Sequence, residues 1–161
     1  MRWIAFASAL WVAGIACQRK PTPACNPPCI NSGVCVAGVC QCPLPFEGSD
    51  CSQDAREKFV GTWEGLRQCG DVRGGMRYFA WKDSLTDQVF LAGSFVAAYQ
   101  DTLAGRLVEP YRMRLSQQLL RDTALAVEGW AEQRWDSLLL QLAVTAGTSQ
   151  RDTCFWTLKR R

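Results

Sequence analysis

The stretch SLLLQLAV (residues 137–144) places a large aliphatic side chain at every second position. In an extended strand successive side chains point to opposite faces, so every second residue shares one face. Here that face carries Leu138, Leu140, Leu142 and Val144. The stretch YRMRLS (111–116) repeats the pattern with Tyr111, Met113 and Leu115. This period of two predicts strands with one buried face.

Six further stretches have strand character: 59–69, 76–83, 88–95, 101–108, 125–133 and 152–159. Turn signals such as GDVRGG, KDSLTD and TAGTSQRD separate several of them. About eight strands joined by short links favour an all-β antiparallel meander closed into a barrel, because closure leaves no strand edge unpaired. Residues 111–122 also fit a helix, because the spacing of their leucines suits both the strand period and the helix period. A helix there would be a local insertion that leaves the rest of the meander intact.

Five of the seven tryptophans follow residue 58: Trp63, Trp81, Trp130, Trp135 and Trp156. Large aromatic residues dominate the cores of small barrels, so we expect core positions, with ligand contact as the alternative. A barrel of about eight short strands is filled if most of its bulky alternating residues point inward. The interior is therefore predicted to be packed, with a small apolar pocket or none. The residues expected to fill it are Trp63, Trp81, Tyr111, Met113, Leu138, Leu140, Leu142 and Trp156.

Six of the nine cysteines lie in CNPPCINSGVCVAGVCQCPLPFEGSDC (25–51), spaced C-x3-C-x5-C-x4-C-x-C-x8-C. Apolar residues are too few here to bury a core, and folds this small usually need covalent or metal staples. A zinc site is the less favoured interpretation, because the stretch lacks paired C-x2-C knuckles. The spacing predicts disulfides and leaves 15 connectivities open.

The same stretch closely resembles an EGF-like domain in its cysteine spacing, its NSG turn before Cys35, Gly38, and the aromatic-x-Gly element of Phe46 and Gly48. The resemblance implies a module that serves as a spacer or a protein-contact surface. It also implies the pairs Cys25–Cys35, Cys29–Cys40 and Cys42–Cys51. Calcium is not expected, because KPTPA (20–24) has no acidic residue before the first cysteine.

The N-terminus pairs Arg2 with the uncharged apolar run WIAFASALWVAGIA (3–16), which predicts a signal peptide over 1–16. Its end, VAGIAC, resembles the lipobox of bacterial lipoproteins, although Gly14 stands where the family usually has an aliphatic residue. The resemblance implies that Cys17 becomes lipid-modified and N-terminal, and it leaves eight of the nine cysteines to pair. An ordinary secretory signal, with Cys17 as a spare thiol, is the alternative. Residues 17–24 would then be the lipidated cysteine and a polar, proline-bearing tether.

After a charged linker, SQDAREK (52–58), residues 59–161 are predicted to form the barrel domain. KFVGTWEGLRQC (58–69) resembles the first strand of lipocalin-like domains through Gly61, Thr62 and Trp63. With the ending DTCFWTLKR (152–160), the chain resembles bacterial lipoproteins that couple a lipobox, one EGF-like module and a small lipocalin-like barrel. The resemblance to that group implies a fourth disulfide, Cys69–Cys154. It implies a domain architecture and does not point to a particular activity.

Composition and motifs argue against an enzyme. The chain has no histidine, so Ser-His and Cys-His nucleophilic sites and histidine-ligated metals are excluded. We find no nucleophile elbow, phosphate loop or dinucleotide motif, and expect no cofactor. The carboxylates Glu128, Glu132 and Asp136 could form an acid/base pair, but exposed strand positions are the simpler interpretation. The net charge of +3 is diluted along the chain, so no nucleic-acid partner is expected.

Two functions remain from the sequence. The first is a non-catalytic lipoprotein of the bacterial cell envelope, anchored in the outer membrane through Cys17, with the EGF-like module and the barrel exterior as contact surfaces for a protein partner. The second is a carrier that holds a small hydrophobic ligand inside the barrel.

Overall fold

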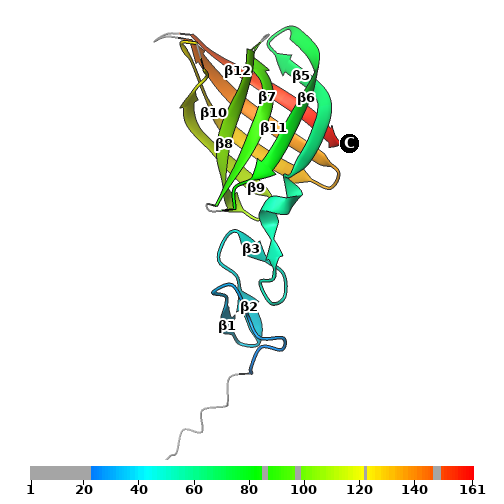
Figure 1. Cartoon of the computed structure of the whole chain (residues 1–161), viewed down its shortest axis with the longest axis vertical. Coiled ribbons are helices and arrows are strands. Elements are labelled where there is room, and N and C mark those ends of the chain that lie inside the picture. Colours follow the sequence, from blue (N-terminus) through cyan, green and yellow to red (C-terminus); the bar gives the residue numbers. More distant parts are fainter. Residues whose placement is uncertain (1–22, 85–86, 97–98, 122, 147–149) are drawn as a thin grey trace, which may run out of the picture.

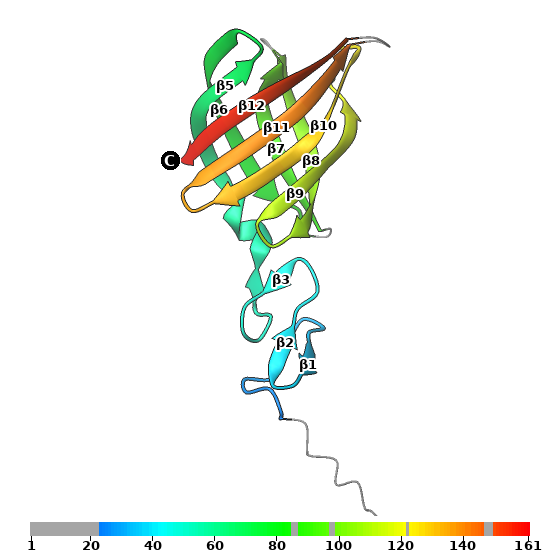
Figure 2. The ribbon, with the colours of Figure 1, turned by 180° about the vertical axis from the view of Figure 1, so that it is seen from behind.

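The computed structural model describes residues 23–84, 87–96, 99–121, 123–146 and 150–161. It is all-β apart from one short 3-10 helix in this described part. A small disulfide-rich module stands at one end of a β-barrel, and the two follow each other along the long axis of the molecule (Figures 1 and 2). No helix among the described residues is long and apolar enough to cross a lipid bilayer.

The module contains two short hairpins, β1 (Val34–Val36) with β2 (Val39–Gln41), and β3 (Phe46–Glu47) with β4 (Gln53–Asp54). Between β1 and β2 the turn residues Ala37 and Gly38 both have positive φ, at 51° and 84°. That backbone matches the twist of a two-residue hairpin loop.

Three disulfides hold the module together: Cys25–Cys35, Cys29–Cys40 and Cys42–Cys51. They confirm the predicted pairs. Apolar side chains such as Val34 and Val39 stay exposed, so covalent links replace a core in this part of the chain.

The barrel consists of eight antiparallel strands, each paired with its neighbours in sequence, and the first strand also pairs with the last. The fold class predicted from the sequence is confirmed. Residues 112–119 form a strand, so the alternative of a helix within 111–122 is wrong. The strands are β5 (Gly61–Cys69), β6 (Val72–Lys82), β7 (Gln88–Val96), β8 (Tyr99–Glu109), β9 (Arg112–Leu119), β10 (Leu125–Arg134), β11 (Ser137–Ala146) and β12 (Gln150–Arg160).

Apolar side chains fill the barrel interior. The alternating residues of β11 that predicted the fold are all buried, as are Trp63 and Trp156. No fully buried residue in the described part is polar or charged. The largest side chains that are almost wholly buried are Trp63, Trp156, Tyr78, Phe59, Phe95, Leu91, Leu103 and Met113.

Two residues expected in the interior lie outside it, so their predictions were wrong. β6 turns Tyr78 and Ala80 inward, and Trp81 consequently faces outward and stacks on Phe90 at 5.5 Å. Tyr111 precedes β9 in a turn, where the alternation has not yet begun, and is 49% exposed.

Two further tryptophans also depart from the expectation of core positions. Trp130 is half-buried on the outer face of β10. Trp135 is 96% exposed in the turn after β10, where its φ is 55°.

The segment 52–58, expected as a charged linker, has secondary structure of its own. It forms β4 and the 3-10 helix η1 (Ala55–Lys58), which Asp54 caps by accepting a hydrogen bond from the Arg56 backbone N–H. Phe59 follows η1 and is completely buried, and its carbonyl accepts a 2.7 Å hydrogen bond from Trp63 Nε1. The module thus leads into the barrel core through ordered backbone.

The fourth predicted disulfide, Cys69–Cys154, is also present. Its cysteines are direct cross-strand partners on β5 and β12, with Cα atoms 4.2 Å apart. The bond therefore links the first and last strands where the barrel closes.

Candidate functional site

The strongest candidate for a contact surface is the outer face of β9, β10, β11 and β12. Strand register places outward side chains in rows that cross all four strands. One row contains Arg114, Trp130, Gln141 and Phe155. The next contains Arg112, Glu132, Leu139 and Thr157. We call these two rows the Trp130 face.

Trp130 is the centre of this face. The guanidinium carbon of Arg112 lies 4.3 Å from the centroid of its indole ring, and that of Arg114 lies 5.5 Å away. Both arginines point outward because Met113 and Leu115 occupy the alternate, buried positions of β9. Stacking of cations on an aromatic ring is favourable and holds the arginines at the surface.

A shallow groove lies on each side of Trp130. One, of about 280 Å³, runs past Glu128, Ala143 and Thr153. The other, of about 270 Å³, is lined by Leu139, Phe155 and Thr157. Trp130 and Gln141 border both grooves. The Trp130 face is therefore grooved, unlike a flat sheet surface.

The charges of the face leave an excess of arginine. Arg151 binds Glu128 at 2.9 Å, and Arg134 binds Glu132 at 2.6 Å. The hydrogen bond from Arg134 is the main reason why the pKa of Glu132 lies below its usual value. Among the described residues, Arg112 and Arg114 form no salt bridge with a carboxylate.

Apolar side chains extend the face toward β5. Phe155 is 52% exposed and Leu66 is 65% exposed. Leu66 is the cross-strand partner of Thr157, so it continues the second row onto β5. Surface Trp, Phe and Arg side chains are together enriched at protein–protein contacts.

The carboxylates considered for acid/base chemistry each bind a basic side chain in the structure. Glu128 and Glu132 point outward to arginines. Asp136 lies in an exposed turn, where hydrogen bonds from Ser137 and then Lys159 lower its pKa. A general acid at neutral pH needs a raised pKa, which Glu132 and Asp136 do not have.

The cysteines in the described part are all oxidised. The sulfur atoms of Cys25, Cys29 and Cys40 lie within 4.8 Å of one another, a spacing that could suit a metal ion. Each of the three is bonded in a disulfide, so none is available as a thiolate ligand. The predicted lipidation site Cys17, the signal peptide and most of the tether lie outside the described residues.

The Trp130 face was not predicted from the sequence. The alternation of β9 does show that Arg112 and Arg114 share the polar side of one strand. The stacking of both on Trp130 depends on the register between β9 and β10, which includes a bulge between Val127 and Gly129. Sequence periodicity within one strand carries no information on that register.

Comparison of the chain with protein-family models, with curated proteins and with solved structures finds no match.

Proposed function

We propose that this protein is a lipid-anchored lipoprotein of the bacterial cell envelope, held in the outer membrane, that binds a protein partner without catalysis. The observation that carries the proposal is the Trp130 face, where two arginines without carboxylate partners stack on a half-buried tryptophan between two grooves. At protein interfaces a few aromatic and arginine side chains supply most of the binding energy. The excess of arginine favours an acidic segment as the partner surface.

The module supports the spacer role in this proposal. Its three disulfides follow the first-to-third, second-to-fourth and fifth-to-sixth order that the EGF-like resemblance implies. Its small size and its position before the barrel suit a spacer between a lipid anchor and the binding domain. In this proposal Cys17 carries the lipid, and two or more acyl chains give stable anchoring.

The packed interior favours surface binding over the alternative, a carrier of a small hydrophobic ligand. Trp63, Tyr78, Phe95 and Trp156 occupy the space that an apolar ligand would need. The surface grooves beside Trp130, and others on β6 to β9, are lined mainly by outward-facing side chains. We therefore expect long-chain alcohols and apolar dyes to show no saturable binding, and one-to-one binding at micromolar affinity would favour the carrier.

Site-specific photo-crosslinking in intact cells tests the contact surface. A photoreactive residue replaces Thr157, beside the second groove, and the matched control replaces Ala92, an outward residue of β7. We expect a discrete protein adduct only from position 157, reduced at least tenfold by Trp130→Ala, which removes an interface anchor worth about 2 kcal/mol. Equal adducts from both positions, or an adduct that persists in the Trp130→Ala protein, would contradict the proposal.

Fractionation tests the anchor separately. The parent protein should sediment with the membranes, and Cys17→Ser should accumulate as uncleaved precursor, because the lipid acceptor is gone. Release of both proteins into the soluble fraction in equal amounts would disprove lipid anchoring at Cys17.

A further inference from the structure

One arginine points into the barrel. Arg67 lies on β5 between Trp63, which is fully buried, and Cys69, which packs against the core. Because alternate residues of a strand share a face, Arg67 belongs to the same inner wall. Its Nε and Nη1 atoms are buried and have no hydrogen-bond partner.

Trp156 on β12 lies next to Arg67 as its direct cross-strand partner. Its buried Nε1 faces the hydroxyl group of Tyr78, which is within hydrogen-bonding reach. The two buried guanidinium nitrogens of Arg67 are therefore the donors at this place that have no acceptor from the protein. Buried donors without acceptors are costly, more so on charged groups, so native proteins rarely keep them unless water, an ion or a ligand accepts the bonds.

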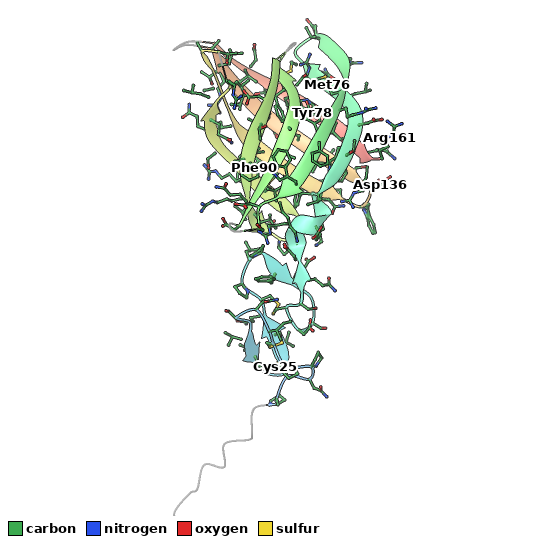
Figure 3. The ribbon with its side chains drawn as sticks, in the orientation of Figure 1. Cys25, Met76, Tyr78, Phe90, Asp136 and Arg161 are labelled. Atoms are coloured by element: carbon green, nitrogen blue, oxygen red, sulfur yellow. A yellow bond between two sulfur atoms is a disulfide. The ribbon has the colours of Figure 1, made fainter. Side chains whose placement is uncertain are left out.

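Tyr78 belongs to the same cluster. Burial raises its pKa, while a hydrogen bond from Trp156 and the positive charge of Arg67 act in the opposite direction, which indicates that both lie near its hydroxyl group. That hydroxyl donates a 3.0 Å hydrogen bond to the carbonyl of Ser94. Tyr78 lies on β6 in the body of the barrel, and Met76 lies further from the module on the same strand (Figure 3).

No carboxylate neutralises Arg67. Among the described residues it takes part in no salt bridge. Asp152 shares the inward face of β12, but it is exposed and does not pair with Arg67. An unpaired guanidinium in a partly buried site favours an anionic partner.

There is also room beside the arginine. On the side opposite Trp156, the cross-strand partner of Arg67 is Gly74 of β6. A β-carbon added at Gly74 would meet no atom within 4 Å, whereas one at Gly93 would collide with the Tyr78 ring. Arg67 is itself only half-buried, so solvent reaches this hollow.

From these observations we propose that Arg67 binds a small oxyanion, the carboxylate or phosphate group of a polar solute, inside the barrel end that lies away from the module. The planar guanidinium matches such groups through two parallel hydrogen bonds. This site differs from the Trp130 face and from the hydrophobic carrier, because it requires charge and no apolar cavity.

Thermal unfolding of the full chain in non-ionic detergent tests the site, with acetate and inorganic phosphate as probes at constant ionic strength. A ligand that binds only the folded state raises Tm in proportion to the logarithm of its concentration. We expect a rise of about 5 °C at roughly ten times the Kd of the preferred probe, which continues with the logarithm of concentration above it. The two probes distinguish a carboxylate site from a phosphate site, and a shift with neither would overturn the proposal.

Two variants locate the effect. Arg67→Met removes the charge at similar length and should abolish the probe-dependent shift while raising Tm without probe, because the unpaired charge is gone. Gly74→Val keeps the charge, fills the hollow and should weaken binding at least tenfold. The matched control Arg73→Met, at an exposed position of β6, should retain the full shift. A shift that survives Arg67→Met unchanged would assign the anion effect elsewhere, whatever the outcome at the Trp130 face.

Discussion

At the scale of single residues, Gly65 shows how closely two strands approach at the barrel seam. A β-carbon at this position of β5 would collide with the carbonyl oxygen of Thr157 on β12. One of the colliding atoms is a β-carbon and the other is a backbone oxygen, so no side-chain rotation can relieve the contact. We expect Gly65→Ala to lower the free energy of unfolding by roughly 1–3 kcal/mol, measured by urea titration.

Gly74 provides the control for that change. It lies on the next strand at an inward position, where an added β-carbon meets open space. Gly74→Ala should leave stability unchanged or raise it by up to about 1 kcal/mol, because alanine loses less backbone entropy on folding. Equal destabilisation by both substitutions would show that the close strand approach at Gly65 is not the cause.

At the scale of elements, the junction between module and barrel depends on Asp54 at the end of β4. Its carboxylate binds Arg56 of η1 at 2.8 Å and Lys82 of β6 at 3.0 Å. Burial alone would raise the pKa of Asp54, but the hydrogen bonds from Arg56 and Lys82 outweigh it and lower the pKa to about 2. Lys58 binds Glu47 of β3 at 2.6 Å and adds a second ionic contact between η1 and the module.

This lowered pKa gives the junction a defined pH dependence. A carboxyl whose pKa falls from 3.8 when unfolded to about 2 when folded stabilises the protein above pH 4, and the contribution disappears as pH falls toward 2. Asp54→Asn should therefore cost about 2 kcal/mol at pH 7 and almost nothing near pH 2. Urea unfolding at several pH values measures the difference from the parent.

The control for the junction is Asp71→Asn, in the exposed turn between β5 and β6. It should unfold at the same urea concentration as the parent at pH 7. If the cost of Asp54→Asn were independent of pH, the ionic contacts of Asp54 would not be the source of its contribution.

At the scale of the whole molecule, the Cys69–Cys154 disulfide joins strands that are 85 residues apart in sequence. Cross-linking a loop of this length removes chain entropy from the unfolded state, with an upper value of roughly 4–5 kcal/mol. The variant with serine at both positions should show a markedly lower Tm in a calorimetric scan. The double change is needed because Cys154→Ser alone leaves a free thiol at Cys69, and an unchanged Tm would exclude a stabilising role for the bond.

The sequence alone determined the strands and the covalent staples. Alternation such as that of Leu138, Leu140 and Leu142 is a property of one strand, so it predicts that strand and its buried face without knowledge of its neighbours. Cysteine spacing is equally local, and the EGF-like resemblance implied the three pairs that the module forms. Together these patterns were enough to predict an all-β chain with a closed barrel.

Tertiary structure alone decided which residues meet across strands. The alternation of β6 does not reveal whether Tyr78 or Trp81 faces inward, because both faces of the strand carry aromatic residues. Only closure of the barrel decides which face of β6 points to the interior. In the same way, only the pairing of β5 with β12 places Arg67 beside Trp156. The Trp130 face and the Arg67 site both arise from register between strands, which depends on non-local packing and which no single stretch of sequence encodes.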